Sequence, residues 1–132
     1  MASSPSERVR VIDSAADWPE IPILDGEGNA KVVMWPGNGA RFRSFHLISM
    51  NEGVSTSKLS HASDCVYYVI GGAGAVVDVG TGEHSPLVEG SMIHIDAGDR
   101  YCLTASVGGL RVIGGPCPPD ETLYLELKTV SE

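Results

Sequence analysis

The chain has 132 residues and a formal net charge of −8, from 17 acidic and 9 basic side chains. This length suits one domain with a single core, and a hydrophobic content of 42% is enough for a folded globule. The acidic balance argues against nucleic acid or an anionic membrane as a partner, and no apolar run approaches the ~20 residues of a membrane-spanning helix.

Cysteine usage and the N-terminus indicate a cytoplasmic protein. The cysteines Cys65, Cys102 and Cys117 are odd in number and form no CxxC pair, which suits a reducing compartment rather than a disulfide framework. Residues 1–10 lack the apolar core of a signal peptide. We therefore expect a cytoplasmic protein without disulfide bonds.

Taken in chain order, the Ser-rich residues 1–7 precede a series of short apolar segments separated by Gly and Pro turns. Asp13 is suited to cap a single helical turn over 14–17, which Pro19 ends. The predicted strands are 8–12, 21–24, 31–35, 41–50, 66–70, 75–79, 86–88, 91–95, 101–107, 110–113 and 123–128.

Turn signals recur about every 8–12 residues and no stretch keeps a helical period, which predicts an all-β sandwich or barrel. We expect a single domain. Residues 1–30 would form an N-terminal arm and the first strands, and residues 31–132 would form the barrel with a C-terminal strand.

Two glycine-framed segments carry a family resemblance. Residues 53–72 keep the spacing of the first cupin motif, G-x5-H-x-H-x3-E-x6-G, and residues 90–101 keep that of the second, G-x5-P-x-G-x2-H. The chain resembles a cupin over roughly residues 31–119. The resemblance implies a small jelly-roll barrel (a double-stranded β-helix) of two antiparallel sheets around a central cavity, and it implies a homodimer.

The ligand positions of the two motifs depart from the family pattern. A typical cupin holds a divalent metal with three histidines and a glutamate, whereas this chain has Leu59, His61, Cys65 and Tyr101 at those places. Leucine has no metal-binding atom, so the metal chemistry of the family does not carry over as a whole. We favour no cofactor, with Zn²⁺ or Fe²⁺ held by His61, Cys65 and Tyr101 as the alternative.

Side-chain alternation sorts the strands into inner and outer faces. If Cys65 points inward, Tyr67 shares its face, and the apolar pair Ile93 and Ile95 faces the barrel as well. In strand 41–50 both faces carry apolar residues, so periodicity cannot choose between them. Analogy with other cupins favours the face with Arg43, Phe45, Leu47 and Ser49 as the inner one.

Three functions remain open for a small molecule bound in the cavity. The first is metal-free acid–base chemistry that isomerises, cyclises or cleaves a small oxygenated or carboxylated molecule, with His61 as the proton carrier. Tyr101 would donate a hydrogen bond to the substrate, and Cys65 would be a nucleophile if His61 lowers its pKa. The second is a mixed metal site with dioxygenase-like activity, and the third is ligand binding without catalysis. The predicted substrate-binding residues are Arg43 as an anion clamp, Leu59, Tyr67, Ile93 and Val112.

Overall fold

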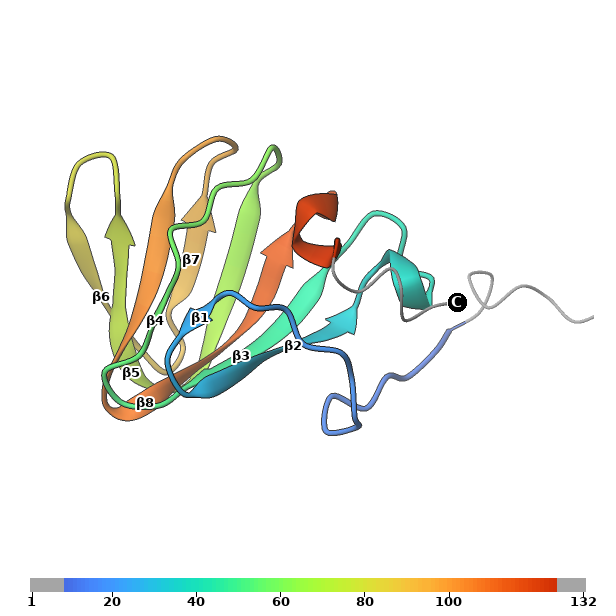
Figure 1. Cartoon of the computed structure of the whole chain (residues 1–132), viewed down its shortest axis with the longest axis horizontal. Coiled ribbons are helices and arrows are strands. Elements are labelled where there is room, and N and C mark those ends of the chain that lie inside the picture. Colours follow the sequence, from blue (N-terminus) through green and yellow to red (C-terminus); the bar gives the residue numbers. More distant parts are fainter. Residues whose placement is uncertain (1–8, 126–132) are drawn as a thin grey trace, which may run out of the picture.

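The computed structural model describes residues 9–125, and within them the chain is mainly antiparallel strand (Figure 1). The elements are β1 (Leu24–Asp25), β2 (Gly28–Met34), η2 (Pro36–Asn38), β3 (Phe45–Met50), β4 (Ser55–Thr56), β5 (Cys65–Asp78), β6 (His84–Val88), β7 (Met92–Ile95), β8 (Tyr101–Pro116) and η3 (Glu121–Tyr124). The all-β prediction is confirmed. Among residues 9–125, no helix has the length and apolar character needed to cross a membrane.

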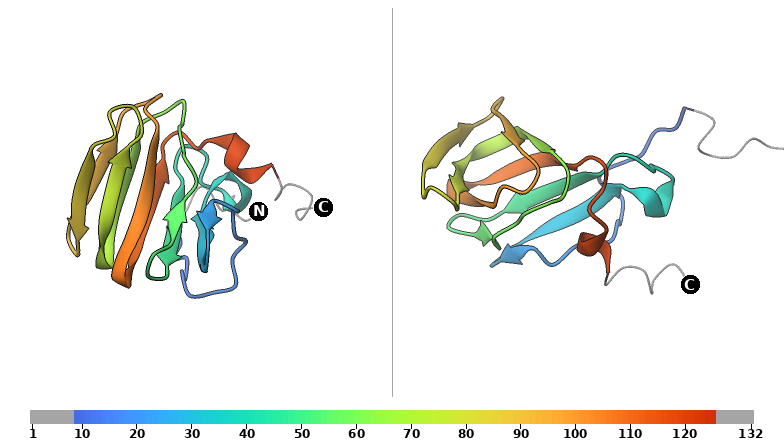
Figure 2. Two further views of the ribbon diagram at one scale, coloured as in Figure 1. Left: turned by 60° about the vertical axis from the view of Figure 1, so that its left-hand side comes forward. Right: turned by 90° about the horizontal axis from the view of Figure 1, so that it is seen from above.

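The long strands β5 and β8 pair with each other and organise the barrel. The first part of β5 also pairs with β7, and its second part pairs with β6. In the same way β3 lies against the second part of β8, and β4 lies against the first part. With β2 beside β3 and β1 beside β4, two half-sheets face each other around the interior (Figure 2).

A glycine-rich bend over residues 71–74 carries β5 from one half-sheet to the other. Gly72 has a φ of +82°, and a Cβ at this position would collide with the backbone oxygen of Gly109. Glycine accepts both this conformation and this close approach, whereas other residues do not. The bend therefore lets a single strand serve both half-sheets.

Alternate residues of β5 and β7 fill the interior, as predicted. Cys65 and Tyr67 are almost completely buried, and Ile93 and Ile95 belong to the same core cluster. Val112 contributes to this core from β8. The interior thus receives side chains from both half-sheets.

The inner face predicted for strand 41–50 is wrong. Arg43 lies before β3 begins and is exposed to solvent, so it is not an anion clamp inside the barrel. The interior instead receives His46, which is 1% exposed, together with Ile48 and Met50 of the core cluster. Because both faces of this strand carry apolar residues, only the surrounding barrel decides which one is buried.

Several predicted strand boundaries also change. Residues 9–12 and 21–23 are not in strands, and Arg8 lies outside the described residues. The strands predicted over 101–107 and 110–113 form the single strand β8, because the chain bends at Gly108 and Gly109, both with positive φ, and continues pairing.

The predicted C-terminal strand over 123–128 is replaced, within the described residues, by the helical turn η3, while residues 126–128 lie outside them. Asp120 caps this turn, because its side chain accepts a hydrogen bond from the backbone N–H of Thr122. The capping bond outweighs the weak alternation that suggested a strand.

Candidate active site

His61 belongs to a buried polar network. Its segment joins β4 to β5, and its backbone oxygen accepts a hydrogen bond from Gly98 N–H at 2.7 Å, which fixes the segment against the turn between β7 and β8. The His61 side chain is buried. Its Nδ1 lies 2.7 Å from Asp120 Oδ2, and its Nε2 lies 2.8 Å from the Tyr101 hydroxyl.

Tyr101 connects His61 to two further buried groups. It is the first residue of β8, and backbone bonds in both directions with Leu59 hold it in place. Its hydroxyl lies 2.8 Å from the Tyr67 hydroxyl and 3.7 Å from Cys65 Sγ. The structure therefore gathers four of the predicted site residues, His61, Cys65, Tyr67 and Tyr101, around one hydroxyl group.

The pKa shifts of Asp120 at one end of the network and of the two tyrosines at the other determine which of these groups carry a proton. Partial burial opposes ionisation of Asp120, but hydrogen bonds from His61 and Thr122 outweigh it and hold the pKa of this carboxyl below its ordinary value. Burial raises the pKa of Tyr101 and of Tyr67 well above the usual range, so both phenols stay protonated.

These protonation states determine which group donates and which group accepts in each hydrogen bond of the network. Because the Asp120 carboxylate only accepts, His61 Nδ1 donates to it, and in the neutral imidazole Nε2 is then an acceptor for the Tyr101 O–H. The Tyr67 O–H in turn donates to the Tyr101 oxygen. A proton reaching Tyr101 can therefore pass to His61, where Asp120 stabilises the imidazolium that forms.

Cys65 does not fit the predicted role of nucleophile. It is completely buried, and this burial raises its pKa to about 11. Cys65 is therefore a thiol at neutral pH, whereas nucleophilic cysteines react as thiolates. In this structure it packs beside Tyr101 and offers that hydroxyl a weak additional contact.

A second histidine–tyrosine pair lies in the interior. His46 Nε2 is 2.6 Å from the hydroxyl of Tyr124, whose ring packs on Trp35 with ring centroids 4.8 Å apart. Burial lowers the pKa of His46 to about 4, and nearby His61 contributes a smaller effect that also lowers it. His46 is therefore neutral near pH 7, and its Nδ1 has no hydrogen-bond partner among the described residues.

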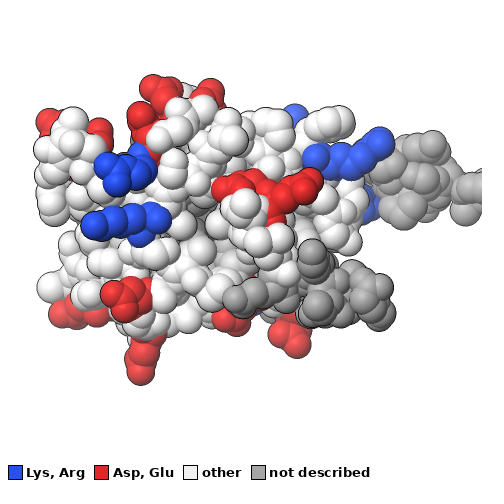
Figure 3. Space-filling model, turned by 45° about the horizontal axis from the view of Figure 1, so that its top comes forward, with Lys and Arg blue, Asp and Glu red and all other residues white. Residues whose placement is uncertain are grey.

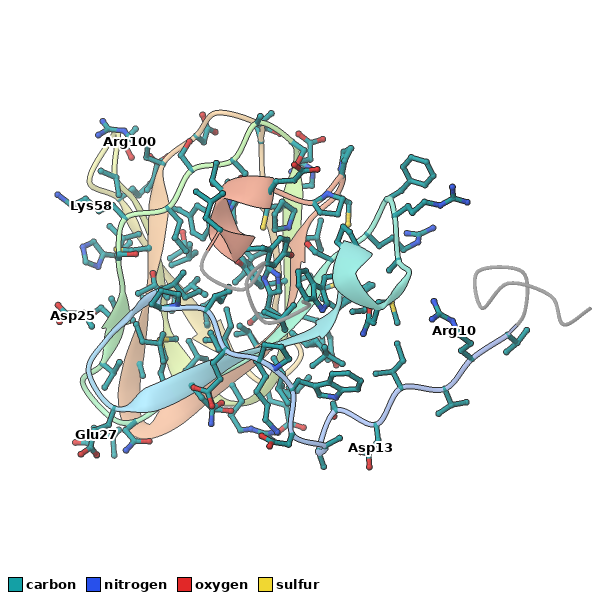
Figure 4. The ribbon with its side chains drawn as sticks, turned by 45° about the vertical axis from the view of Figure 1, so that its right-hand side comes forward. Arg10, Asp13, Asp25, Glu27, Lys58 and Arg100 are labelled. Atoms are coloured by element: carbon teal, nitrogen blue, oxygen red, sulfur yellow. The ribbon has the colours of Figure 1, made fainter. Side chains whose placement is uncertain are left out.

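A cavity of about 160 Å³ opens beside Tyr101, between β7 and the second part of β5 with β6. Its apolar wall includes Val76, Ile93 and Ile95, and Tyr101 is the network residue that lines it. Its lining also includes the charged residues Asp78, Glu83, Asp99 and Arg100, together with His94. In Figure 4 Arg100 and Lys58 point outward on one side of the molecule, and Arg10 lies on the other side.

The wider surface on the view in Figure 3 carries its basic side chains in two separate groups, with acidic side chains between and around them. The described part of this face therefore has no continuous basic surface.

The predicted substrate-binding residues do not all line the cavity. Ile93 lines the cavity, whereas Leu59, Tyr67 and Val112 belong to the core beside it, and Arg43 is remote from the interior.

Sequence reasoning missed Asp120, Tyr124 and His46. Asp120 lies 59 residues from His61 in the chain, and no local pattern links the two. The spacing Asp120-x-Thr122 was a usable signal, because it is typical of a capped turn. His46 is a single histidine within a strand, and its contact with Tyr124 spans 78 residues, so no local pattern marks it either.

The donor set does not fit the metal centre that the family resemblance implies. Leu59 has no ligand atom, and both ring nitrogens of His61 are engaged by Asp120 and Tyr101. Among residues 9–125, no group of at least three His, Cys, Asp or Glu side chains gathers at metal-binding distance.

No protein-family model matches the sequence, and no curated protein matches it. Solved structures do match. KdgF from Halomonas sp. superposes with a TM-score of 0.69 at 17% identity, over 87% of this chain and 98% of that chain. A cupin-like protein from Thermotoga maritima gives 0.67 at 18% identity, over 79% of this chain and 80% of that chain.

Ectoine synthase from P. lautus gives a TM-score of 0.60 at 23% identity, over 76% of this chain and 69% of that chain. At these identities the likeness concerns the fold alone. In this chain the first glycine-framed motif runs from the turn before β4 into β5, and the second runs from the turn before β7 to the first residue of β8. The protein has the cupin fold.

Proposed function

We propose that the protein is an enzyme of acid–base chemistry that isomerises, cyclises or cleaves a small oxygenated or carboxylated molecule. The observation that carries this proposal is the chain of hydrogen bonds Asp120–His61–Tyr101–Tyr67, which reaches the cavity at Tyr101. Tyr101 is the group that touches the substrate, His61 accepts and returns the proton, and Asp120 is a positioning residue.

The first step moves a proton from the substrate to the Tyr101 oxygen while the Tyr101 proton passes to His61 Nε2. This concerted transfer avoids a free tyrosinate, which the raised pKa of Tyr101 makes costly. Asp120 stabilises the imidazolium and keeps Nε2 aimed at Tyr101. Return of the proton to another substrate atom completes an isomerisation, and its delivery to a leaving group completes an elimination.

The cavity limits the size and polarity of the substrate. A cavity of this volume matches about the space of a benzene ring, so the fitting molecules have about six to ten heavy atoms. Val76, Ile93 and Ile95 would contact their apolar part. A substrate carboxylate would bind at Arg100, since the other charged groups of the lining are mostly carboxylates, and hydroxyl or carbonyl oxygens would face Tyr101.

The comparison with solved structures supports catalysis on this fold in general. Ectoine synthase is an enzyme by its name, and its structure superposes on this chain. The fold does not select a substrate, because function resides in the site rather than in the barrel. The alternative of a metal-dependent enzyme has less support, since the donor set does not fit it.

The test is exchange of substrate hydrogen with solvent. A panel of small hydroxy and oxo acids is incubated with the protein in D₂O, and deuterium incorporation and product formation are followed by NMR. We expect exchange that falls by about 10²–10⁴ in His61→Gln and in Tyr101→Phe and survives in the control His84→Gln, which changes an exposed histidine that does not line the cavity. Full exchange in His61→Gln would overturn the proposal. So would activity that disappears with a chelator and returns with added Zn²⁺ or Fe²⁺.

A further inference from the structure

The segment that follows β8, residues 117–125, crosses one end of the barrel and includes η3 (Figure 1). We call it the strap. Its start is tied to the segment before β5, because Cys117 N–H donates to the Asp64 backbone oxygen at 3.0 Å and the Ser63 hydroxyl donates to the Pro118 backbone oxygen at 2.6 Å. These bonds fix the end of the strap nearest to β8.

Beyond Pro118 the strap is held by side chains. Among the described residues, no backbone–backbone hydrogen bond joins residues 119–125 to the barrel, and the bond from Leu123 N–H to the Asp120 backbone oxygen stays within the strap, at the start of η3. A segment without backbone pairing opens at a lower free energy than the strands beneath it. The strap can therefore detach while β5 and β8 stay paired.

Two side chains hold the strap in place, and each of them contacts one of the two buried histidines. Asp120 reaches His61 at 2.7 Å, and Tyr124 reaches His46 at 2.6 Å. Tyr124 is only 6% exposed, and its ring also packs on Trp35. Asp120 caps η3 and Tyr124 is its last residue, so one helical turn carries both contacts.

We propose that the strap is a lid whose closure completes the active site. When closed, it supplies the carboxylate that orients His61 and covers both histidines. When open, it exposes His46 and His61 together, and the proton relay lacks Asp120. Opening thus removes the carboxylate on which the acid–base power of the site depends, and closure restores it. The catalytic consequence rests on the proposed function, whereas the opening motion does not.

Histidine acylation measures this motion without any substrate. Diethyl pyrocarbonate reacts with accessible imidazoles, and mass spectrometry follows each of the four histidines of the chain. In the wild type we expect the exposed His84 and His94 to react at least about tenfold faster than the buried His46 and His61. The exposed pair serves as an internal control for the reagent.

Tyr124→Ala removes the main anchor of the strap, and Glu121→Gln changes an exposed side chain on the same turn as the matched control. In Tyr124→Ala we expect the rates of His46 and His61 to rise together by about tenfold or more, with His84 and His94 unchanged. In Glu121→Gln all four rates should stay at wild-type values. Exposure of His46 alone in Tyr124→Ala, or continued protection of both, would overturn the proposal.

If Tyr124→Ala does not fold, the wild type provides a second test of the lid. The same rates are measured at rising urea concentrations below the global unfolding transition, which circular dichroism defines. We expect His46 and His61 to gain reactivity together before the strands unfold. Reactivity that appears only with global unfolding contradicts the lid. Because neither experiment uses turnover, a failure of the deuterium-exchange assay leaves this result intact, and a failure here leaves the proposed chemistry intact.

Discussion

Replacing Tyr101 by phenylalanine removes the one hydroxyl that joins the buried network. That hydroxyl lies 2.8 Å from His61 Nε2 and 2.8 Å from the Tyr67 hydroxyl. His61 is 4% exposed and Tyr67 is 1% exposed, so bulk water does not replace the lost bonds. A buried polar group without a partner costs about 1–3 kcal/mol, and two such groups remain. We expect Tyr101→Phe to lower the free energy of unfolding by about 2–6 kcal/mol.

Tyr67→Phe is the matched control. It leaves the Tyr101 O–H donating to His61, so no buried donor is stranded. The expected loss is about 1 kcal/mol, the value of one ordinary hydrogen bond. The double variant should lose less than the sum of the two single variants, because Tyr67→Phe removes one of the groups that Tyr101→Phe leaves unpaired.

Urea unfolding followed by tryptophan fluorescence gives all four free energies. Equal losses in the two single variants would refute the idea that Tyr101 is the central member of the network. Strict additivity in the double variant would also refute it, because independent hydroxyls do not couple.

Other consequences of the structure can be tested on the purified protein. Gly114→Ala places a Cβ against the Val66 backbone oxygen at φ +153° and should lower the free energy of unfolding by about 3 kcal/mol or more, whereas Gly98→Ala, with open space around its Cβ, should lose about 1–2 kcal/mol. Equal losses in urea unfolding would contradict this. Cys65, with a pKa of about 11, should resist thiol reagents at neutral pH in the folded protein, and its rapid labelling in a mass-spectrometric assay would contradict the burial. The unfolded chain protonates His46 near pH 6.5, but the folded chain does so only near pH 4. Stability should therefore fall by about 3 kcal/mol as the pH drops through this window, and His46→Asn should reduce that loss in acid titrations.

Much of the fold was predictable from local sequence features. Glycines such as Gly53, Gly72 and Gly90 adopt positive φ, so their spacing records where the chain must turn. The alternation of β7 also placed Ile93 correctly in the interior, because the face with Ile93 and Ile95 is more apolar than the face with Met92 and His94, whereas Cys65 was placed there by its position in the first motif. These features depend on neighbours along the chain, which a single sequence displays.

The site was predictable only in part, because its key contacts are distant in sequence. The motif spacing brought His61 and Tyr101 to one place, since it encodes the pairing of Leu59 with Tyr101. Asp120 belongs to a turn 59 residues away along the chain, and no sequence pattern near His61 predicts their contact. The inner face of β3 depended on the barrel around it, and there the analogy used for Arg43 failed.

The relay from Asp120 through His61 to Tyr101 is the central claim, and the tautomer of His61 tests it most directly. Nitrogen-15 NMR of the ring, recorded on the folded protein in the neutral form of His61, locates its single proton. We predict that Nδ1 carries the proton and donates to Asp120, leaving Nε2 as the acceptor for Tyr101. In Asp120→Ala this preference should be lost. A neutral ring protonated at Nε2 in the wild type would contradict the account, because such a ring has no atom free to take a proton from Tyr101.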